Sequence, residues 1–149
     1  MEYESLPRMN PRIYLLLATI AGAFALVGCG AGESAATVAY PIIPDASGES
    51  QYAANCQVCH GNPATGDERQ LDAPRHDGDG HTWHHADRPL VEWVLNGVPG
   101  GSGLMPAFSD QLSKAEVASI IAYIKSTWTP ELQASQMENS QAWENQLVK

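Results

Sequence analysis

The sequence predicts an all-α fold, and two observations carry this prediction. Apolar residues repeat at helical spacing near the end of the chain, directly after a helix-start signal. No stretch shows the alternation of apolar and polar residues that is typical of a half-buried strand. The chain has 149 residues, 44% of them hydrophobic. This length suits one ordinary domain, and the composition is too apolar for a fully disordered chain.

Two helices are expected at the end of the chain. Residues 113–116 read Ser-Lys-Ala-Glu, a capping box, so the last core helix is expected to start at Ser113. Thr129 and Pro130 can start a further helix, but apolar positions in residues 130–149 are sparse. We therefore expect an appended C-terminal helix that is packed loosely or partly frayed. The apolar face of the core helix consists of Val117, Ile120, Ile121, Ile124 and Trp128.

A shorter helix is expected before these two. Asp87 is predicted to cap it, and the helix is predicted to run through Trp93. Pro89 falls in its first turn and Gly97 lies just past its end, the positions in which these residue types favour helix boundaries.

The N-terminal segment has the pattern of an export signal. Two arginines precede the uncharged, apolar run 13–27, which is shorter than the about 20 residues that a spanning helix needs. Residues 26–29 read Leu-Val-Gly-Cys and resemble a bacterial lipobox, in which Cys29 is lipid-modified and becomes the mature N-terminus. The alternative is an uncleaved anchor helix with an incidental cysteine. Both interpretations tether the rest of the chain outside the cytoplasmic membrane.

One pentapeptide carries the chemistry of the chain. Residues 56–60 read Cys-Gln-Val-Cys-His, which is C-x-x-C-H, the attachment sequence for a c-type haem. Cys56 and Cys59 can each add across one haem vinyl group, and the adjacent His60 is thereby held beneath the iron as the proximal ligand. We therefore expect one covalently attached haem c.

Three other uses of the two thiols are less well supported. A thioredoxin-like redox motif would need a βαβ context, which is not visible in the sequence. A disulfide between Cys56 and Cys59 would close a strained small loop. A structural zinc site would need a second cysteine pair, although several histidines are available. These histidines are His76, His81, His84 and His85.

The stretch 48–128 resembles a class I (monohaem) cytochrome c. Four features carry the resemblance. A glycine, an aromatic residue and the first thiol share one helical face at Gly48, Tyr52 and Cys56, and a glycine, Gly61, follows the haem histidine. Residues 103–108 are similar to the distal methionine loop, and the C-terminal helix ends in Tyr-Ile-Lys-Ser at residues 123–126. In the family, the glycine and the aromatic residue of the N-terminal helix cross the C-terminal helix closely.

The resemblance implies a cytochrome c fold, in which helices and long loops wrap around one covalently attached haem. A domain of roughly 80 residues has a thin core of its own, so we expect folding to depend on the haem. We divide the chain into a lipoprotein signal peptide (1–28), a lipidated N-terminus with a flexible linker (29–47), the cytochrome c domain (48–128) and a C-terminal extension (129–149).

Met105 is the expected sixth ligand of the iron. It lies 45 residues after His60, in a loop with glycines at 97, 100, 101 and 103, and is followed by Pro106. Glycines allow the backbone to approach the porphyrin closely, and the proline stiffens the loop at the ligand. Three competing donors remain, namely His81, His84 and His85.

Residues 61–88 form a mostly acidic loop that is long for this family. Pro74 occupies a position similar to the family's proline after the haem motif, whose carbonyl orients the proximal histidine. If the positions match, this carbonyl accepts the Nδ1–H of His60. Residues 77–80 superficially resemble a calcium loop, but the glycine and glutamate that such a loop requires are missing.

The segment 81–85 reads His-Thr-Trp-His-His and has three interpretations. The histidines could form a transition-metal site. The segment could instead lie beside the haem propionates, with Trp83 donating through its Nε1–H. The third interpretation is an exposed polar loop with one anchoring tryptophan.

A haem held by His60 and Met105 has no vacant coordination position, so it exchanges electrons and does not bind substrate. We therefore expect an electron carrier, not an enzyme: a membrane-tethered monohaem cytochrome c that transfers single electrons between extracytoplasmic respiratory partners. Methionine ligation favours ferrous iron and raises the potential. The alternatives are a haem-containing subunit or sensor domain of a larger oxidoreductase complex and, less well supported, a haem-free metal-binding lipoprotein.

The charge of the chain limits its partners. Eight Lys+Arg against seventeen Asp+Glu give a formal net charge of −9, which excludes a general nucleic-acid binder. We expect redox partners that present basic docking patches, with association weakened by salt. The expected location is the extracytoplasmic side of the cell membrane, periplasmic or outer face, through lipid at Cys29.

Overall fold

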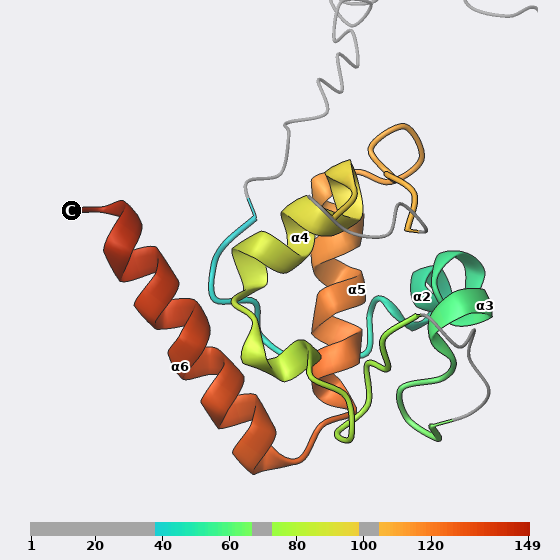
Figure 1. The fold of residues 1–149 in the computed structure, drawn as a ribbon, viewed down its shortest axis with the longest axis horizontal. Coiled ribbons are helices and arrows are strands. Elements are labelled where there is room, and N and C mark those ends of the chain that lie inside the picture. The colour runs from blue at the N-terminus through green and yellow to red at the C-terminus, as the bar shows by residue number, and fades with distance from the viewer. Residues whose placement is uncertain (1–37, 67–72, 99–104) are drawn as a thin grey trace, which may run out of the picture. The chain divides into compact units, whose positions relative to one another are not determined.

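The computed structural model describes residues 38–66, 73–98 and 105–149, and in these ranges the chain is helical with no strand (Figure 1). The all-α prediction is therefore confirmed for this part of the chain. The signal peptide, Cys29 and the glycines at 100, 101 and 103 lie outside the described residues. In order, the elements are α2 (Glu49–Asn55), α3 (Gln57–His60), the 3-10 helix η1 (Thr82–His84), α4 (Asp87–Asn96), α5 (Lys114–Ser126) and α6 (Pro130–Leu147).

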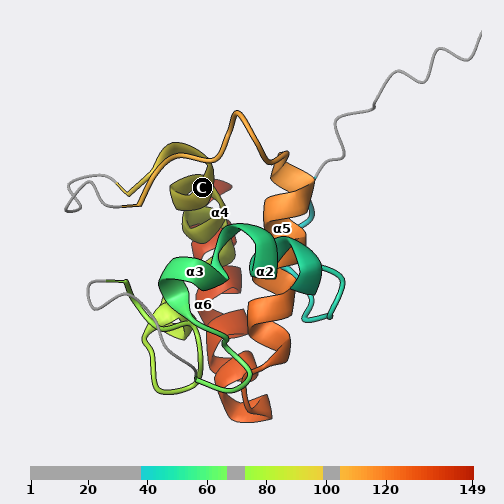
Figure 2. The same ribbon diagram turned by 90° about the vertical axis from the view of Figure 1, so that its right-hand side faces the viewer.

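Helix α5 is central and packs against both α2 and α4 (Figures 1 and 2). It begins with the predicted capping box: the Ser113 hydroxyl accepts from the Glu116 N–H, and the Glu116 carboxylate accepts from the Ser113 N–H at 2.8 Å. This reciprocal pair satisfies backbone donors that a helix start leaves open. The predicted apolar face is buried in full and forms the centre of the core: Val117, Ile120, Ile121, Ile124 and Trp128.

Helix α2 crosses α5 at very short range, as the resemblance implies. A Cβ atom added at Gly48 would lie 2.0 Å from the carbonyl oxygen of Ser119, so only glycine fits at the crossing. One turn further on, the buried Tyr52 packs against Tyr123 of α5 with ring centroids 5.5 Å apart. The Tyr52 hydroxyl donates to the carbonyl oxygen of Gly61 at 2.8 Å. The crossing therefore ties the turn after α3 to α5.

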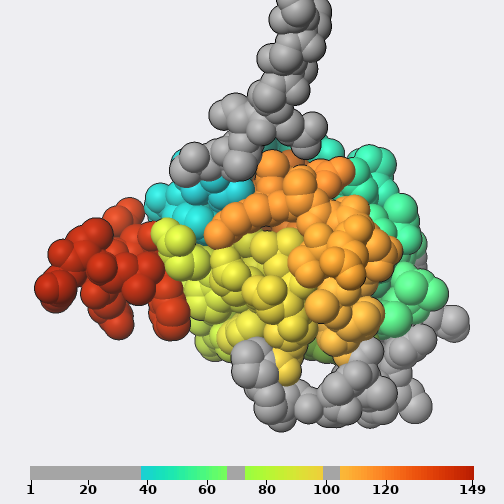
Figure 3. Space-filling view, turned by 90° about the horizontal axis from the view of Figure 1, so that it is seen from above, coloured from blue at the N-terminus to red at the C-terminus, as the bar shows by residue number. Residues whose placement is uncertain are grey.

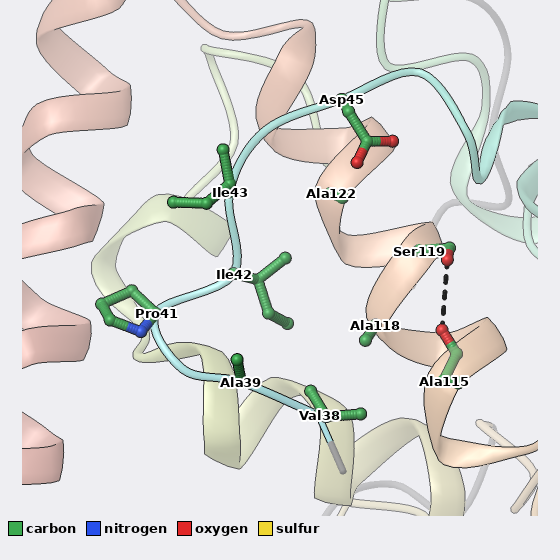
Figure 4. A pocket seen from close by; sticks show the side chains of 10 residues that line it. All are labelled: Val38, Ala39, Pro41, Ile42, Ile43, Asp45, Ala115, Ala118, Ser119 and Ala122. Carbon is green, nitrogen blue, oxygen red and sulfur yellow. Dashed lines mark hydrogen bonds between the residues drawn. The ribbon is translucent and has the colours of Figure 1, made fainter. Parts of the chain in front are cut away.

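Residues 38–47, the described end of the predicted linker, run beside α5 as a strap (Figure 4). Ile42 is buried in the core, and the Asp45 N–H donates to the carbonyl oxygen of Ala122 in α5 at 3.2 Å. A shallow, mostly apolar groove of about 290 Å³ lies between the strap and α5. The expectation of a flexible linker therefore does not hold for these ten positions, because their backbone is bound to α5 and the side chains of Val38, Tyr40 and Ile42 pack against the core.

The prediction for the start of α4 is wrong. Its N-cap is Ala86, and Asp87 is the first residue of a helix that continues to Asn96, three residues past the expected end. The Asp87 side chain does not cap the helix, because it is fully buried and contacts the buried ammonium of Lys125 with both oxygens at 3.0 Å. A buried charge needs a partner, and the Asp87 N–H at the helix start is satisfied by Ser140 Oγ instead of by a cap. The helix ends at Gly97, which has a φ of 80°.

The buried ion pair joins four segments of the chain. From the strap, the Ile42 N–H donates to Asp87 Oδ2 at 2.7 Å and the Ile42 carbonyl accepts from Lys125 Nζ at 2.5 Å. From α6, Gln136 Nε2 donates to Asp87 Oδ1 at 2.8 Å, and Ser140 Oγ accepts from the Asp87 N–H at 3.0 Å. The strap, α4, α5 and α6 therefore meet at one set of polar groups with no exposed surface on either charge.

The loose or frayed packing predicted for the C-terminal helix is wrong for the first part of α6. The helix is continuous, and Gln136 and Ser140 on it are buried. The prediction took the few apolar residues of this helix as a sign of loose packing, whereas the helix docks mainly through amide and hydroxyl groups. Figure 3 shows its second half standing out beyond the surface of α4 and the strap. There Trp143 is 42% exposed and Leu147 is 58% exposed.

Candidate haem site

The pentapeptide lies where α2 gives way to α3. Cys56 is the C-cap of α2 and the N-cap of α3, and its N–H donates to the carbonyl oxygen of Tyr52 at 2.8 Å. Cys59 and His60 complete the single turn of α3, which ends at Gly61 with a φ of 72°. This positive φ favours glycine and lets the chain turn away directly after the histidine. The two thiols and the imidazole are thus held on one short, rigid stretch.

The two thiols are not joined in a disulfide in the structure. Cys56 and Cys59 are both half-buried, while Val58 between them is 75% exposed. Burial raises the pKa of the Cys56 thiol to about 11. Within the described ranges, no group of three or more His, Cys, Asp or Glu side chains is placed to hold a metal ion. The zinc alternative has no support there.

His60 is buried and its ring is held in one orientation. Its Nδ1 lies 2.8 Å from the carbonyl oxygen of Pro74, which confirms the contact that the resemblance implied. A carbonyl can only accept, so Nδ1 carries the proton. Burial lowers the pKa of His60, which keeps the ring neutral at pH 7. Nε2 is therefore the nitrogen with a lone pair, the state in which imidazole binds iron.

A second imidazole, which the sequence analysis considered only as a zinc ligand, lies against the first. The rings of His60 and His76 are stacked, with centroids 4.2 Å apart and planes at 26°. The edge of Tyr52 also meets His76, at a centroid distance of 6.2 Å. Burial lowers the pKa of His76 to about 3, so this ring is neutral as well. The clue in the sequence was its place two residues after Pro74, which had already been assigned to the surroundings of His60.

The loop that presents His76 is closed by its own polar groups. The guanidinium of Arg75 forms an ion pair with Asp77, and Asp77 Oδ1 accepts from the Gly80 N–H at 3.1 Å. The Thr82 hydroxyl donates to the Arg75 carbonyl at 3.2 Å. These contacts engage the Asp77 carboxylate, in agreement with the rejection of a calcium loop. They join residues 75–82 into a closed loop that supports His76.

In the segment 81–85, residues Thr82–His84 form the 3-10 helix η1, and Thr82 is buried. The Nε1–H of Trp83 donates to the Gly80 carbonyl at 3.0 Å and so anchors the segment to its own loop, while the contact with a haem propionate stays a prediction. His84 is exposed and stacks on Trp83 with centroids 3.6 Å apart. His81 is exposed too, and its ring meets that of His85 at 5.4 Å edge to face, an aromatic contact instead of a metal site.

Met105 is half-buried and follows α4 in the chain. Its carbonyl oxygen lies 3.7 Å from where a Cβ of Gly97 would be, and the N–H of Phe108 donates to the Val94 carbonyl at 3.0 Å. The methionine segment is thus fastened to the end of α4. Residues 99–104, which lead into it, lie outside the described residues. No contact in the described part joins Met105 to His60, so its role as sixth ligand stays a prediction.

The donor set fits haem c. Two free thiols three positions apart are the groups that haem vinyls take up, and the neighbouring imidazole keeps one nitrogen for iron while the other is held by a carbonyl. Residues 44–124 match the family described as cytochrome c oxidase, cbb3-type, subunit III. The chain belongs to this cytochrome c family.

A curated relative agrees with this assignment. Cytochrome c6 from Picosynechococcus sp. is 37% identical to the chain over 81 residues, which are 53% of this chain and 69% of the relative. No solved structure gives a significant match. The chain is therefore an electron-carrier cytochrome with one covalent haem c, and such domains are extracytoplasmic. In the described ranges, no helix has both the length and the apolar character needed to cross a bilayer.

Proposed function

We propose that Cys56 and Cys59 hold the haem through thioether bonds and that His60 and Met105 ligate its iron. The observation that carries this proposal is the geometry of His60: its Nδ1–H is fixed by the Pro74 carbonyl at 2.8 Å, which leaves Nε2 for the metal beside two free thiols. When bound, the haem supplies one-electron redox chemistry. The surrounding residues keep the imidazole neutral, hydrogen-bonded and buried.

With both axial positions filled, the function that follows is transfer of single electrons without binding of a substrate. A thioether ligand favours ferrous iron, so the carrier has a high potential relative to a bis-imidazole haem. A hydrogen bond from Nδ1 to a neutral carbonyl polarises the imidazole less than a bond to a carboxylate does, which acts in the same direction. Such a carrier suits respiratory partners of high potential.

We also propose that lipid at Cys29 tethers this carrier on the extracytoplasmic side of the membrane. The described strap begins nine residues later, at Val38, and nine residues span at most about 30 Å. A tether of this length keeps the domain close to membrane complexes and raises its effective concentration there. The net charge of −9 supports partners with basic docking patches.

The second candidate is a haem subunit of a larger oxidoreductase complex. It is favoured by the description of the matching family, which names a subunit of a cbb3-type cytochrome oxidase. The two candidates differ in assembly. A tethered carrier migrates alone after mild detergent extraction, whereas a subunit copurifies with its oxidoreductase in fixed stoichiometry.

The ligation is tested on protein matured with the cytochrome c assembly machinery. We expect haem to stay on the chain in a denaturing gel, and to be lost from the double variant Cys56→Ala/Cys59→Ala. We expect the methionine–iron charge-transfer band in the wild type, its loss in Met105→Ala, and its retention in the control Met137→Ala, since Met137 is a half-buried methionine of α6. A band that survives Met105→Ala would contradict this sixth ligand.

The tether is tested by metabolic labelling with a fatty acid. We expect label in the wild type and in the control Ser34→Ala, and no label in Cys29→Ser. Labelling that persists in Cys29→Ser would contradict lipidation at this cysteine, whether or not the chain stays in the membrane fraction.

A further inference from the structure

The contact between His60 and His76 has a consequence beyond packing. We propose that His76 is a positioning residue for the haem iron: its ring, stacked on His60, fixes the plane in which the proximal imidazole coordinates. The proposal rests on the proposed ligation of iron by His60. It assigns a role to a side chain that lies outside the attachment motif.

The hydrogen bonds define the state of the His76 ring. Its Nδ1 lies 2.8 Å from Thr82 Oγ1. The single hydroxyl proton of Thr82 is donated to the carbonyl of Arg75 at 3.2 Å, so the Thr82 oxygen accepts from His76. His76 Nδ1 therefore carries a proton, as His60 Nδ1 does toward Pro74. Two imidazoles in the same tautomer are stacked, each held by a hydrogen bond at Nδ1.

One hydrogen bond alone does not fix a ring plane. The bond from His60 Nδ1 to the Pro74 carbonyl restrains one atom, and the ring can still rock about the line between donor and acceptor. A flat partner at 4.2 Å blocks this motion, because any tilt of His60 drives its edge into the face of His76. The hydrogen bond and the stack together leave one orientation.

His76 can block the tilt of the His60 ring because the position of His76 is itself fixed by several contacts. Its backbone carbonyl accepts from Trp128 Nε1–H at 2.6 Å, which ties it to the end of the core helix. Its Nδ1 is held by Thr82, and Tyr52 meets its ring from the side. Tyr52 and Trp128 are buried. The position of His76 is thus set by α2, by η1 and by Trp128, which lies just after α5.

The plane of a proximal imidazole decides how its π orbitals overlap with the iron d orbitals. In ferric haem this overlap sets the directions of the magnetic axes, and with them the pattern of paramagnetically shifted haem methyl resonances. A residue that only fills space near His60 would not determine this pattern. The pattern therefore reports positioning separately from stability.

The test compares the ferric haem methyl shifts of four variants with the wild type. His76→Phe keeps a flat ring but loses the hydrogen bond to Thr82, so its pattern should stay closer to the wild type than that of His76→Leu. His76→Leu keeps apolar volume but removes the flat face, so the pattern should be lost and the midpoint potential should shift. Thr82→Val removes the acceptor that holds His76 and should move the pattern in the direction of His76→Leu, by a smaller amount. The control His84→Leu removes an exposed histidine and should leave the pattern unchanged.

The failure of this inference and the failure of the proposed ligation look different. Covalent haem and the methionine–iron band in the wild type, with altered axial ligation in His60→Ala, establish the ligation first. If the ligation holds and His76→Leu keeps the wild-type methyl pattern, His76 is packing only and the inference is overturned. If His76→Leu does not fold, Thr82→Val decides, because it keeps both rings. An unchanged pattern there overturns the inference as well.

Discussion

At the scale of single residues, His60 has two neighbours outside the attachment motif, because its Nδ1–H donates to the Pro74 carbonyl and its ring stacks on that of His76. The attachment motif is local, and Pro74 was placed through the family resemblance. The stacking of His76 on His60 depends on a loop that is closed by the ion pair of Arg75 with Asp77. No periodicity or motif in the sequence predicts that this loop closes. Sequence reasoning therefore found the ligand candidate and missed the residue that we propose positions it.

Gly48 gives the most direct prediction at this scale. Gly48→Ala places a methyl group 2.0 Å from the Ser119 carbonyl oxygen, so α2 must move away from α5. We expect a loss on the order of 3 kcal/mol in the free energy of unfolding, measured by denaturant titration of the holoprotein. The control is Gly78→Ala, whose methyl group meets only the flexible Leu132 side chain at 3.3 Å. Equal stability of the two variants would contradict the close crossing.

At the scale of elements, α5 was predicted well because its signals are local in the sequence. Its capping box and apolar spacing lie within its own residues and both are present in the structure. Helix α4 and helix α6 were described wrongly because their side chains serve distant partners. The contact of Gln136 with Asp87 joins positions 49 residues apart. In the sequence, Asp87 has the pattern of a helix cap, because rules for neighbouring residues cannot predict its ion pair with the distant Lys125.

The buried ion pair predicts an asymmetry between two lysines. Lys125→Met leaves the Asp87 carboxylate buried without its cation, and we expect a loss of about 3–5 kcal/mol in stability. Lys114→Met removes an ammonium that pairs with the half-exposed Glu92 at 2.9 Å, and we expect a loss of less than about 1 kcal/mol. Chemical denaturation at neutral pH checks both. A Lys125→Met protein as stable as Lys114→Met would show that the network does not hold the four segments together.

The second half of α6 should loosen in acid. The hydrogen bond from Arg88 lowers the pKa of Glu144, so this contact stabilises α6 above the ordinary glutamate pKa of about 4.3 and is lost as pH falls through the lowered value. Both side chains are still partly exposed, so solvent screens the pair and the effect is less than about 1 kcal/mol. Amide hydrogen exchange in α6, corrected for intrinsic rates, should show more opening at low pH. Glu144→Gln should show this opening already at neutral pH, while a variant with unchanged exchange would exclude the pair as a support.

At the scale of the whole molecule, charge sets how the carrier meets its partners. The predicted signal segment 1–28 carries two arginines and two glutamates, so the mature chain keeps the formal charge of −9 of the full sequence. In the described part, the two shortest surface ion pairs join Arg75 to Asp77 and Arg88 to Glu144. The positive charge of these two arginines is therefore already neutralised by carboxylates of the same chain. The field that a partner meets is therefore that of a net anion.

This field predicts opposite salt dependences for two small redox reagents of similar potential, one cationic and one anionic. The cationic reagent is attracted, so its rate of electron exchange with the holoprotein should be the higher one at low ionic strength and should fall as salt is added. The anionic reagent is repelled, so its rate should rise. The screening length decreases from about 30 Å at 0.01 M to about 10 Å at 0.1 M, so most of the change in both rates should occur in this range of ionic strength.

Stopped-flow absorbance of the haem measures both rates. If the two reagents respond to salt in the same direction, charge does not guide access to the haem, and partners with basic docking patches lose their physical basis.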